Sequence, residues 1–170
     1  MLTPEQEKWI ESLSDKTITI IPYDPRAGEL FIKIKERIES VLGSKVIVEH
    51  VGASSLGISG QDEVDVSIVA KKEDFEVYIK KLEPLFGPPR SRYPDRARFD
   101  VREEGKKIDL KIVDKNHPNY IESKKFEEYL KQHPETLERY RALKEECDGL
   151  TTKEYYRKKA GFINEILDMQ

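Results

Sequence analysis

Two carboxylates and a turn of small residues are the features of this sequence best suited to chemistry. The turn is Gly52-Ala53-Ser54-Ser55, and Asp65 follows in a stretch where polar and apolar residues alternate. Backbone N–H groups and hydroxyls in such a turn can bind a phosphate. We therefore expect Gly52, Ser54 and Ser55 to contact phosphate oxygens, although both serines could equally cap the turn.

Asp65 is the expected metal ligand. Residues 63, 65 and 67 share one face of a strand, and they are Glu63, Asp65 and Ser67. A strand that alternates in this way packs one side on a core and leaves the other side open. Glu63, at the entrance of the strand, is a further candidate metal ligand.

The second carboxylate is Asp109, which alternates with apolar residues between positions 107 and 113. If this strand lies beside residues 64–69, Asp65 and Asp109 converge on one sheet face. Carboxylate oxygens at such a place suit Mg²⁺, or Mn²⁺ in its stead. Lys111, on the same side of its strand, is expected to bind phosphate, and the alternative is a solvated ion pair with Asp65.

Two further lysines lie one helical turn after a tyrosine, in the pairs Tyr140/Lys144 and Tyr155/Lys159. If the tyrosines pack on the sheet, Lys144 and Lys159 would reach the polar face and bind an anionic substrate. The alternative is that both lysines lie on the surface.

The composition predicts a cytoplasmic protein of one domain, residues 1–170. Thirty Lys and Arg oppose 33 Asp and Glu, for a net charge of -3, which gives no strong field to attract nucleic acid. No apolar run approaches the length of a membrane span, and the start of the chain lacks a signal pattern. The single cysteine, Cys147, is expected in the core. The oligomeric state is left open.

The pattern of apolar residues predicts an α+β fold with a sheet core at 17–116 and a helical part at 117–170. Residues 103–106 join two of the expected strands, 96–102 and 107–113, with the spacing of a hairpin. The expected strands are 17–21, 45–51, 64–69, 96–102 and 107–113. The expected helices are 3–13, 25–42, 72–86, 120–132, 134–147 and 151–169.

Several stretches of the chain, in order, resemble the GrpB-like family of the nucleotidyltransferase superfamily. They include Pro22-Tyr23-Asp24-Pro25, the stretch 49–56 around Gly52, Val64-Asp65-Val66 and residues 109–113. The resemblance continues through the C-terminal helices. It implies a nucleotidyltransferase-like (polymerase-β-like) mixed sheet flanked by helices, with a helical C-terminal subdomain.

The resemblance also implies a site in which Gly52 and a neighbouring serine hold nucleotide phosphates. Asp65 would bind the metal, and Asp109 would take the place of the third carboxylate. Superfamily enzymes usually carry two carboxylates one residue apart, whereas Asp65 is followed by Ser67 and preceded by Glu63.

Two functions remain open at this point. The first is Mg²⁺-dependent transfer of a nucleotidyl group from a nucleoside triphosphate to an unknown acceptor. The second is a degenerate, non-catalytic module that binds a nucleotide or another phosphorylated small molecule. The sequence leaves open whether the chain is an enzyme.

Overall fold

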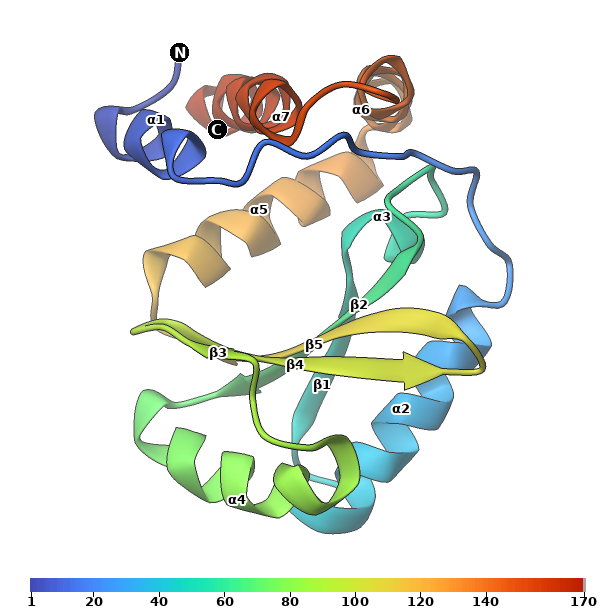
Figure 1. Ribbon diagram of the computed structural model, residues 1–170, viewed down its shortest axis with the longest axis vertical. Coiled ribbons are helices and arrows are strands. Elements are labelled where there is room, and N and C mark those ends of the chain that lie inside the picture. The colour runs from blue at the N-terminus through green and yellow to red at the C-terminus, as the bar shows by residue number, and fades with distance from the viewer. Residues whose placement is uncertain (170) are drawn as a thin grey trace. The chain divides into compact units, whose positions relative to one another are not determined.

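The computed structural model describes residues 1–169 and divides the chain into two compact units (Figure 1). The sheet unit consists of Tyr23–Gly57 and Asp62–Ser123. The helical unit consists of Met1–Pro22, Ile58–Gln61 and the described residues from Lys124 onward. Residues 17–22, expected within the sheet core, thus belong to the helical unit.

The sheet unit contains a five-stranded sheet with the order β1-β2-β5-β4-β3. β2 and β5 are parallel and the other neighbouring strands are antiparallel, so the predicted mixed sheet is confirmed. The strands are β1 Ile47–Val51, β2 Glu63–Ala70, β3 Ser91–Arg92, β4 Arg96–Glu103 and β5 Lys106–Asp114.

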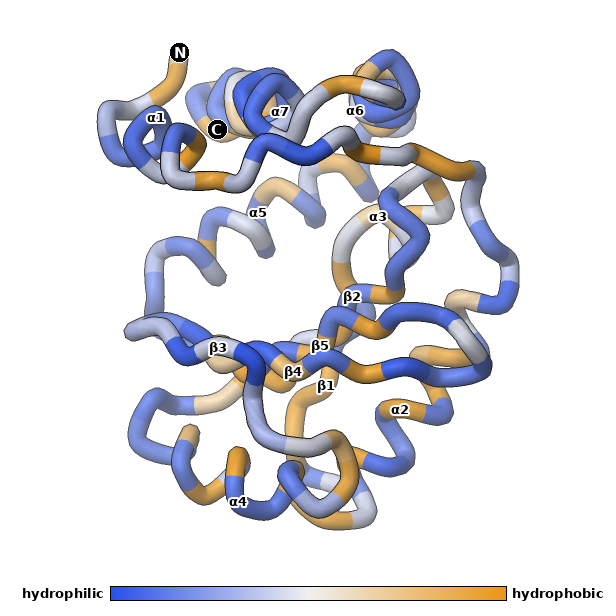
Figure 2. Tube along the Cα trace, viewed as in Figure 1, coloured by the Kyte–Doolittle hydropathy of each residue, from blue (hydrophilic) through white to orange (hydrophobic). Residues whose placement is uncertain are grey.

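One face of this sheet is apolar and is covered by α2 (Ala27–Leu42) and α4 (Phe75–Phe86). Hydrophobic and hydrophilic residues alternate along β2, β4 and β5 (Figure 2). The alternation places every second side chain in the core and the others on the opposite face. The core includes Val66, Ile68, Phe99, Leu110 and Ile112 from the strands, with Leu30, Ile34, Ile38, Ile79 and Leu82 from the helices.

Two short helices complete the sheet unit. α3 (Gly52–Ser55) follows β1 directly, and the 3₁₀ turn η1 (Lys72–Asp74) leads into α4. α5 (Pro118–Gln132) begins in the sheet unit and continues into the helical unit.

The helical unit contains α1 (Pro4–Glu11), α6 (Pro134–Glu146), α7 (Thr152–Asp168) and the later part of α5. Thr3 and Gln6 form a capping box at the start of α1. Tyr140 and Phe162 are buried, with ring centroids 5.3 Å apart. Tyr155 is buried too, whereas Ile163 is only partly buried.

The strand expected at residues 17–21 is wrong. Only isolated bridges form there, from Thr17 to Thr151 and from Ile21 to Gly60. The backbone of this segment forms hydrogen bonds with loops of the helical unit. The Ile18 N–H donates to the Leu150 carbonyl, and the N–H and carbonyl of Ile21 bond to the carbonyl and N–H of Gly60. Ile18 is instead buried in the core of the helical unit, where it packs with Cys147 and Tyr155, and Ile20 packs against this cluster, whereas Thr17 and Thr19 are exposed.

Candidate functional site

The sheet face opposite α2 and α4 carries the predicted carboxylates, and we call it the polar face. Asp65 and Asp109 are direct partners in the parallel pairing of β2 and β5. Opposed residues of neighbouring strands project to the same face. The expectation that the two carboxylates lie side by side on one face is therefore confirmed.

Asp109 is the most buried charge of the polar face, with a side chain only 6% exposed. Its two oxygens accept from Arg98, with Nε to Oδ1 at 3.2 Å and Nη2 to Oδ2 at 2.8 Å. Burial by itself raises the pKa of Asp109, but Lys111 and Arg98 outweigh burial and hold this pKa below its ordinary value. Asp109 is therefore ionised and tied to a guanidinium.

Arg98 was absent from the predicted site. It lies on β4, where Arg98 pairs with Lys111 and Asp100 pairs with Asp109. A tight turn at Gly105 fixes this register, so the hairpin placed Arg98 diagonally across from Asp109. Counting residues back from the turn would have found it.

Lys111 lies between the two carboxylates. Its Nζ is 3.8 Å from Asp65 Oδ1 and 3.8 Å from Asp109 Oδ2, distances too long for hydrogen bonds. The alternative that the sequence left open, an ion pair of Lys111 with Asp65, is present, and the pair is shared with Asp109. The Lys111 side chain is 24% exposed and can therefore be reached from solvent.

Gly52 and Asp65 are in close contact. Gly52 has φ +74°, and a Cβ at this position would lie 2.3 Å from Asp65 Oδ2. Any other residue would strain the backbone and collide with the carboxylate. The small turn is therefore fitted to Asp65, which links the two motifs that stood out in the sequence.

Ser54 and Ser55 make hydrogen bonds within the turn region. Ser55 Oγ donates to the Gly52 carbonyl at 2.8 Å, and Ser54 Oγ is 2.9 Å from His50 Nε2. His50 in turn stacks on Phe31 of α2, with ring centroids 4.9 Å apart. Neither contact is the cap that the sequence offered as the alternative, because α3 begins after Val51 without a side-chain cap. A role of the two serines in phosphate binding stays a prediction.

The donor set of the polar face does not suit a resident Mg²⁺ ion. Both oxygens of Asp109 accept from Arg98, and the ammonium of Lys111 lies beside Asp65 and Asp109. Glu63, the third expected ligand, pairs with Lys107 at 2.6 Å. Within residues 1–169 no group of three or more His, Cys, Asp or Glu side chains is arranged to hold a metal ion.

Lys144 and Lys159 belong to the helical unit. Lys144 is 4% exposed, and its Nζ is 5.4 Å from the centroid of the Tyr140 ring. Lys159 Nζ is 5.8 Å from the centroid of the Tyr155 ring. Each lysine therefore packs on the tyrosine one turn before it, and the binding of phosphate by either lysine stays a prediction.

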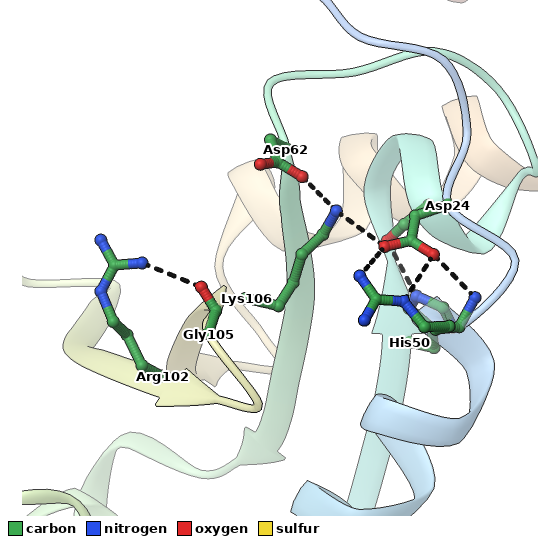
Figure 3. A network of polar contacts seen from close by, with 8 residues as sticks. Asp24, His50, Asp62, Arg102, Gly105 and Lys106 are labelled. Carbon is green, nitrogen blue, oxygen red and sulfur yellow. Dashed lines mark hydrogen bonds and ion pairs between the residues drawn. The ribbon is translucent and has the colours of Figure 1, made fainter.

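A second charged cluster surrounds Lys106 at the start of β5 (Figure 3). The Lys106 ammonium bonds to Asp62 and, at 3.2 Å, to Asp24 Oδ2. Burial lowers the pKa of Lys106, but the two carboxylates outweigh burial and raise it above the ordinary value. Asp24 also accepts from the backbone N–H of Arg26 at 3.0 Å. Lys106 thus ties the hairpin to the residues that precede α2 and β2.

A comparison with models of protein families shows the family of this chain. The family model described as GrpB protein matches residues 17–169, which is most of the chain. The chain belongs to the GrpB family. The motifs that resembled this family in the sequence include Asp24, Gly52, Asp65 and Asp109, and each of them has a defined place in the sheet unit.

Two curated relatives of this GrpB-family chain carry the name UPF0157. The UPF0157 protein BH1888 of Halalkalibacterium halodurans is 28% identical over 158 residues, covering 89% of this chain and 81% of the relative. The UPF0157 protein VC_A0354 of Vibrio cholerae is 27% identical over 149 residues, covering 85% and 78%.

A solved structure shares the fold. It is the conserved protein GrpB from Enterococcus faecalis, with a TM-score of 0.66 and 19% sequence identity, covering 86% of this chain and 93% of that one. Among residues 1–169, no helix has both the length and the apolar character needed to cross a membrane.

Proposed function

We propose that the polar face binds a phosphorylated small molecule, with a nucleotide as the expected ligand, and that it does so as a non-catalytic module of nucleotidyltransferase-like fold. One observation carries the proposal. Two cations, Lys111 and Arg98, are register partners on neighbouring strands, and each is paired with a carboxylate of the same face, Asp65 or Asp109.

The geometry of these cations supports anion binding. Lys111 and Arg98 are direct register partners, and their side chains are 24% and 28% exposed. A guanidinium can hold phosphate oxygens in pairs, and an ammonium adds a point charge. Asp109 and Asp65 limit the motion of both groups, so less conformational entropy is lost when a phosphate binds.

The electrostatics also favour a module without a metal. Asp65 and Asp109 are already balanced by Lys111 and Arg98, so the site lacks the excess negative charge that attracts Mg²⁺. Ser67 occupies the place two residues after Asp65, where a second carboxylate would strengthen a metal site.

Mg²⁺-dependent nucleotidyl transfer is the second candidate. It is favoured by the direct pairing of Asp65 with Asp109 and by the close fit of Gly52 against Asp65. For this function Arg98 would have to release Asp109.

The variant Asp65→Asn separates the two candidates because they predict opposite signs. In a phosphate-binding module, the loss of a carboxylate beside the ligand tightens the binding of a nucleoside triphosphate. The gain is on the order of 1 kcal/mol for charges a few ångströms apart at a solvated site. In a metal-dependent transferase, the same variant loses Mg²⁺-dependent binding and turnover.

The measurement is calorimetric titration with a nucleoside triphosphate, in Mg²⁺ and in EDTA, together with an assay of pyrophosphate release. Lys111→Met should abolish binding, and Lys71→Met is the matched control because Lys71 is an exposed lysine of the sheet unit. Absence of triphosphate binding to the wild type in both buffers would overturn both candidates.

A further inference from the structure

The hairpin of β3 and β4 carries an exposed aromatic ring close to the two cations of the proposed site. Residues 90–98 contain four arginines and Tyr93, and they form β3, a short turn and the start of β4. The Tyr93 N–H donates to the Arg96 carbonyl at 2.8 Å and closes this turn. Aromatic rings among cations are typical of surfaces that bind both the bases and the phosphates of nucleotides.

Arg96 lies on the polar face, next to the proposed phosphate site. It precedes Arg98 by two residues on β4, so the two side chains project to the same face. In the register of β4 and β5, Arg96 pairs with Val113, and Arg98 pairs with Lys111. Each residue of a strand adds about 3.4 Å, so the Cα atoms of Arg96 and Arg98 are roughly 7 Å apart. The sugar of a nucleotide separates its base from its first phosphate by a distance of this order.

Arg96 and Tyr93 form a stack that is held in place. The guanidinium carbon of Arg96 lies 4.3 Å from the centroid of the Tyr93 ring. Arg96 Nη1 donates to both carboxylate oxygens of Asp95, each at 2.9 Å. Asp95 is buried and also accepts from Asn119 Nδ2 at 3.1 Å. Tyr93 itself is 49% exposed, so part of its ring remains open to a ligand.

We infer that Tyr93 stacks on the base of the bound nucleotide, with Arg96 as the residue that positions its ring. This inference rests on the proposed function and assigns a second part of the same site. The phosphates contact Lys111 and Arg98, and the base lies at the turn between β3 and β4. A planar base can stack on an aromatic ring whichever base it is. The predicted ligand class is therefore a nucleotide of any base, rather than a phosphorylated molecule without one.

The pairing of Arg96 with Asp95 favours stacking over charge as the role of this turn. The carboxylate of Asp95 already balances the guanidinium, so Arg96 adds little attraction for a further phosphate. The contact with Arg96 restricts the motion of the Tyr93 ring, so less conformational entropy is lost when a base binds. The turn thus selects ligands by the presence of the base.

The test compares adenosine triphosphate with ribose 5-triphosphate, which has the same sugar and phosphates but lacks the base. Calorimetric titration of the protein in EDTA should show adenosine triphosphate binding about tenfold more tightly, a factor within the range of base–aromatic stacking. The ring current of Tyr93 should also shift the adenine proton signals of the bound nucleotide upfield in nuclear magnetic resonance spectra.

Tyr93→Leu should remove both the preference for adenosine triphosphate and the upfield shift, and it should leave the affinity for ribose 5-triphosphate unchanged. Tyr93→Phe keeps the ring and should keep both effects. Tyr23→Leu is the matched control, because Tyr23 is another exposed tyrosine of the sheet unit. Circular dichroism checks that each variant is folded.

Two results would overturn the inference alone. One is equal affinity of the wild type for the two triphosphates, and the other is a preference for adenosine triphosphate that persists in Tyr93→Leu. In both cases the binding of triphosphate, and with it the proposed function, would stand. Absence of binding for both triphosphates would overturn the proposed function as well.

Discussion

The two aspartates of the polar face are held in position by contacts with neighbouring residues. Asp109 is held by Arg98 and Lys111, and Asp65 lies against the backbone of Gly52. A substitution at either position therefore acts through a named partner.

Gly52→Ala should destabilise the protein more than Gly57→Ala. Both glycines have positive φ, +74° and +69°, but only the Cβ at position 52 would meet Asp65, at 2.3 Å, because nothing lies within 4 Å at position 57. Gly57→Ala should cost about 1–2 kcal/mol of unfolding free energy from backbone strain, and Gly52→Ala about 1–3 kcal/mol more from overpacking.

Urea unfolding of the two variants measures the difference. Adding Asp65→Ala to Gly52→Ala should restore the part of the unfolding free energy that is lost to overpacking, whereas the part lost to backbone strain should remain lost. Equal costs at positions 52 and 57 would show that the carboxylate moves aside freely.

Acid should weaken the protein through Asp109. The pKa of Asp109 is lower in the folded protein than in the unfolded chain. Its contribution to the unfolding free energy is therefore fully present above the ordinary Asp pKa of about 3.9 and is lost as the pH falls through the lower folded value.

Asp109→Asn should remove that part of the acid dependence and cost about 2 kcal/mol at neutral pH, because Arg98 loses its partner. Urea unfolding between about pH 6 and pH 2 checks the effect. Asp100→Asn is the matched control, since Asp100 is an exposed carboxylate on the neighbouring strand. An unchanged pH profile in Asp109→Asn would contradict the assignment.

At the scale of elements, the sequence predicted those parts whose apolar residues follow one period. β2 alternates cleanly and was expected at 64–69, close to its observed bounds. α2 presents Leu30, Ile34 and Ile38 on one stripe and was expected at 25–42. Within the site, the pairing of Asp65 with Asp109 was expected only on the condition that their strands were neighbours.

The features that the sequence missed depend on tertiary partners. Residues 17–21 have strand composition, but their backbone bonds to loops of the helical unit. β3 has only two residues, too few to show a period. Arg98 lies beside Asp109 because of the register between β4 and β5. Lys106 contacts two carboxylates, Asp24 and Asp62, that are distant from it in the sequence.

Lys106→Met should loosen the contact between the hairpin and the start of α2. The ammonium bonds to Asp24 and Asp62, so the loss should be about 2 kcal/mol, as for hydrogen bonds between charged groups. Hydrogen exchange should accelerate at the Arg26 amide, which donates to Asp24. Lys107→Met, which removes the more exposed neighbouring lysine, should leave that amide protected.

At the scale of the whole molecule, the two units have different cores. The sheet core joins residues of α2, α4 and three strands, whereas Ile18, Cys147 and Tyr155 form a cluster within the helical unit. β2 and β5 are paired on both sides, so their opening requires loss of the sheet. We expect the two cores to open at different free energies.

Thiol labelling of Cys147 should measure the opening of the helical unit. The thiol is fully buried, and burial raises its pKa, so it should not react in the closed state. The free energy of opening from labelling should be smaller than that of the slowest amides of β2 and β5. Ile18→Ala should speed labelling and leave those amides unchanged. Equal free energies for both probes would mean that the protein opens as one cooperative unit.

The helical unit is built from three separate segments of the chain, and this affects how it folds during synthesis on the ribosome. Met1–Pro22 and Ile58–Gln61 leave the ribosome long before α6 and α7, the elements that supply Cys147 and Tyr155 to the core around Ile18. The sheet unit ends at Ser123, so it can fold on the growing chain while those early segments still lack their partners. We therefore expect Ile18 and its neighbours to be exposed during that interval, and the segment around Ile18 to be open to proteases and chaperones until α6 and α7 are made.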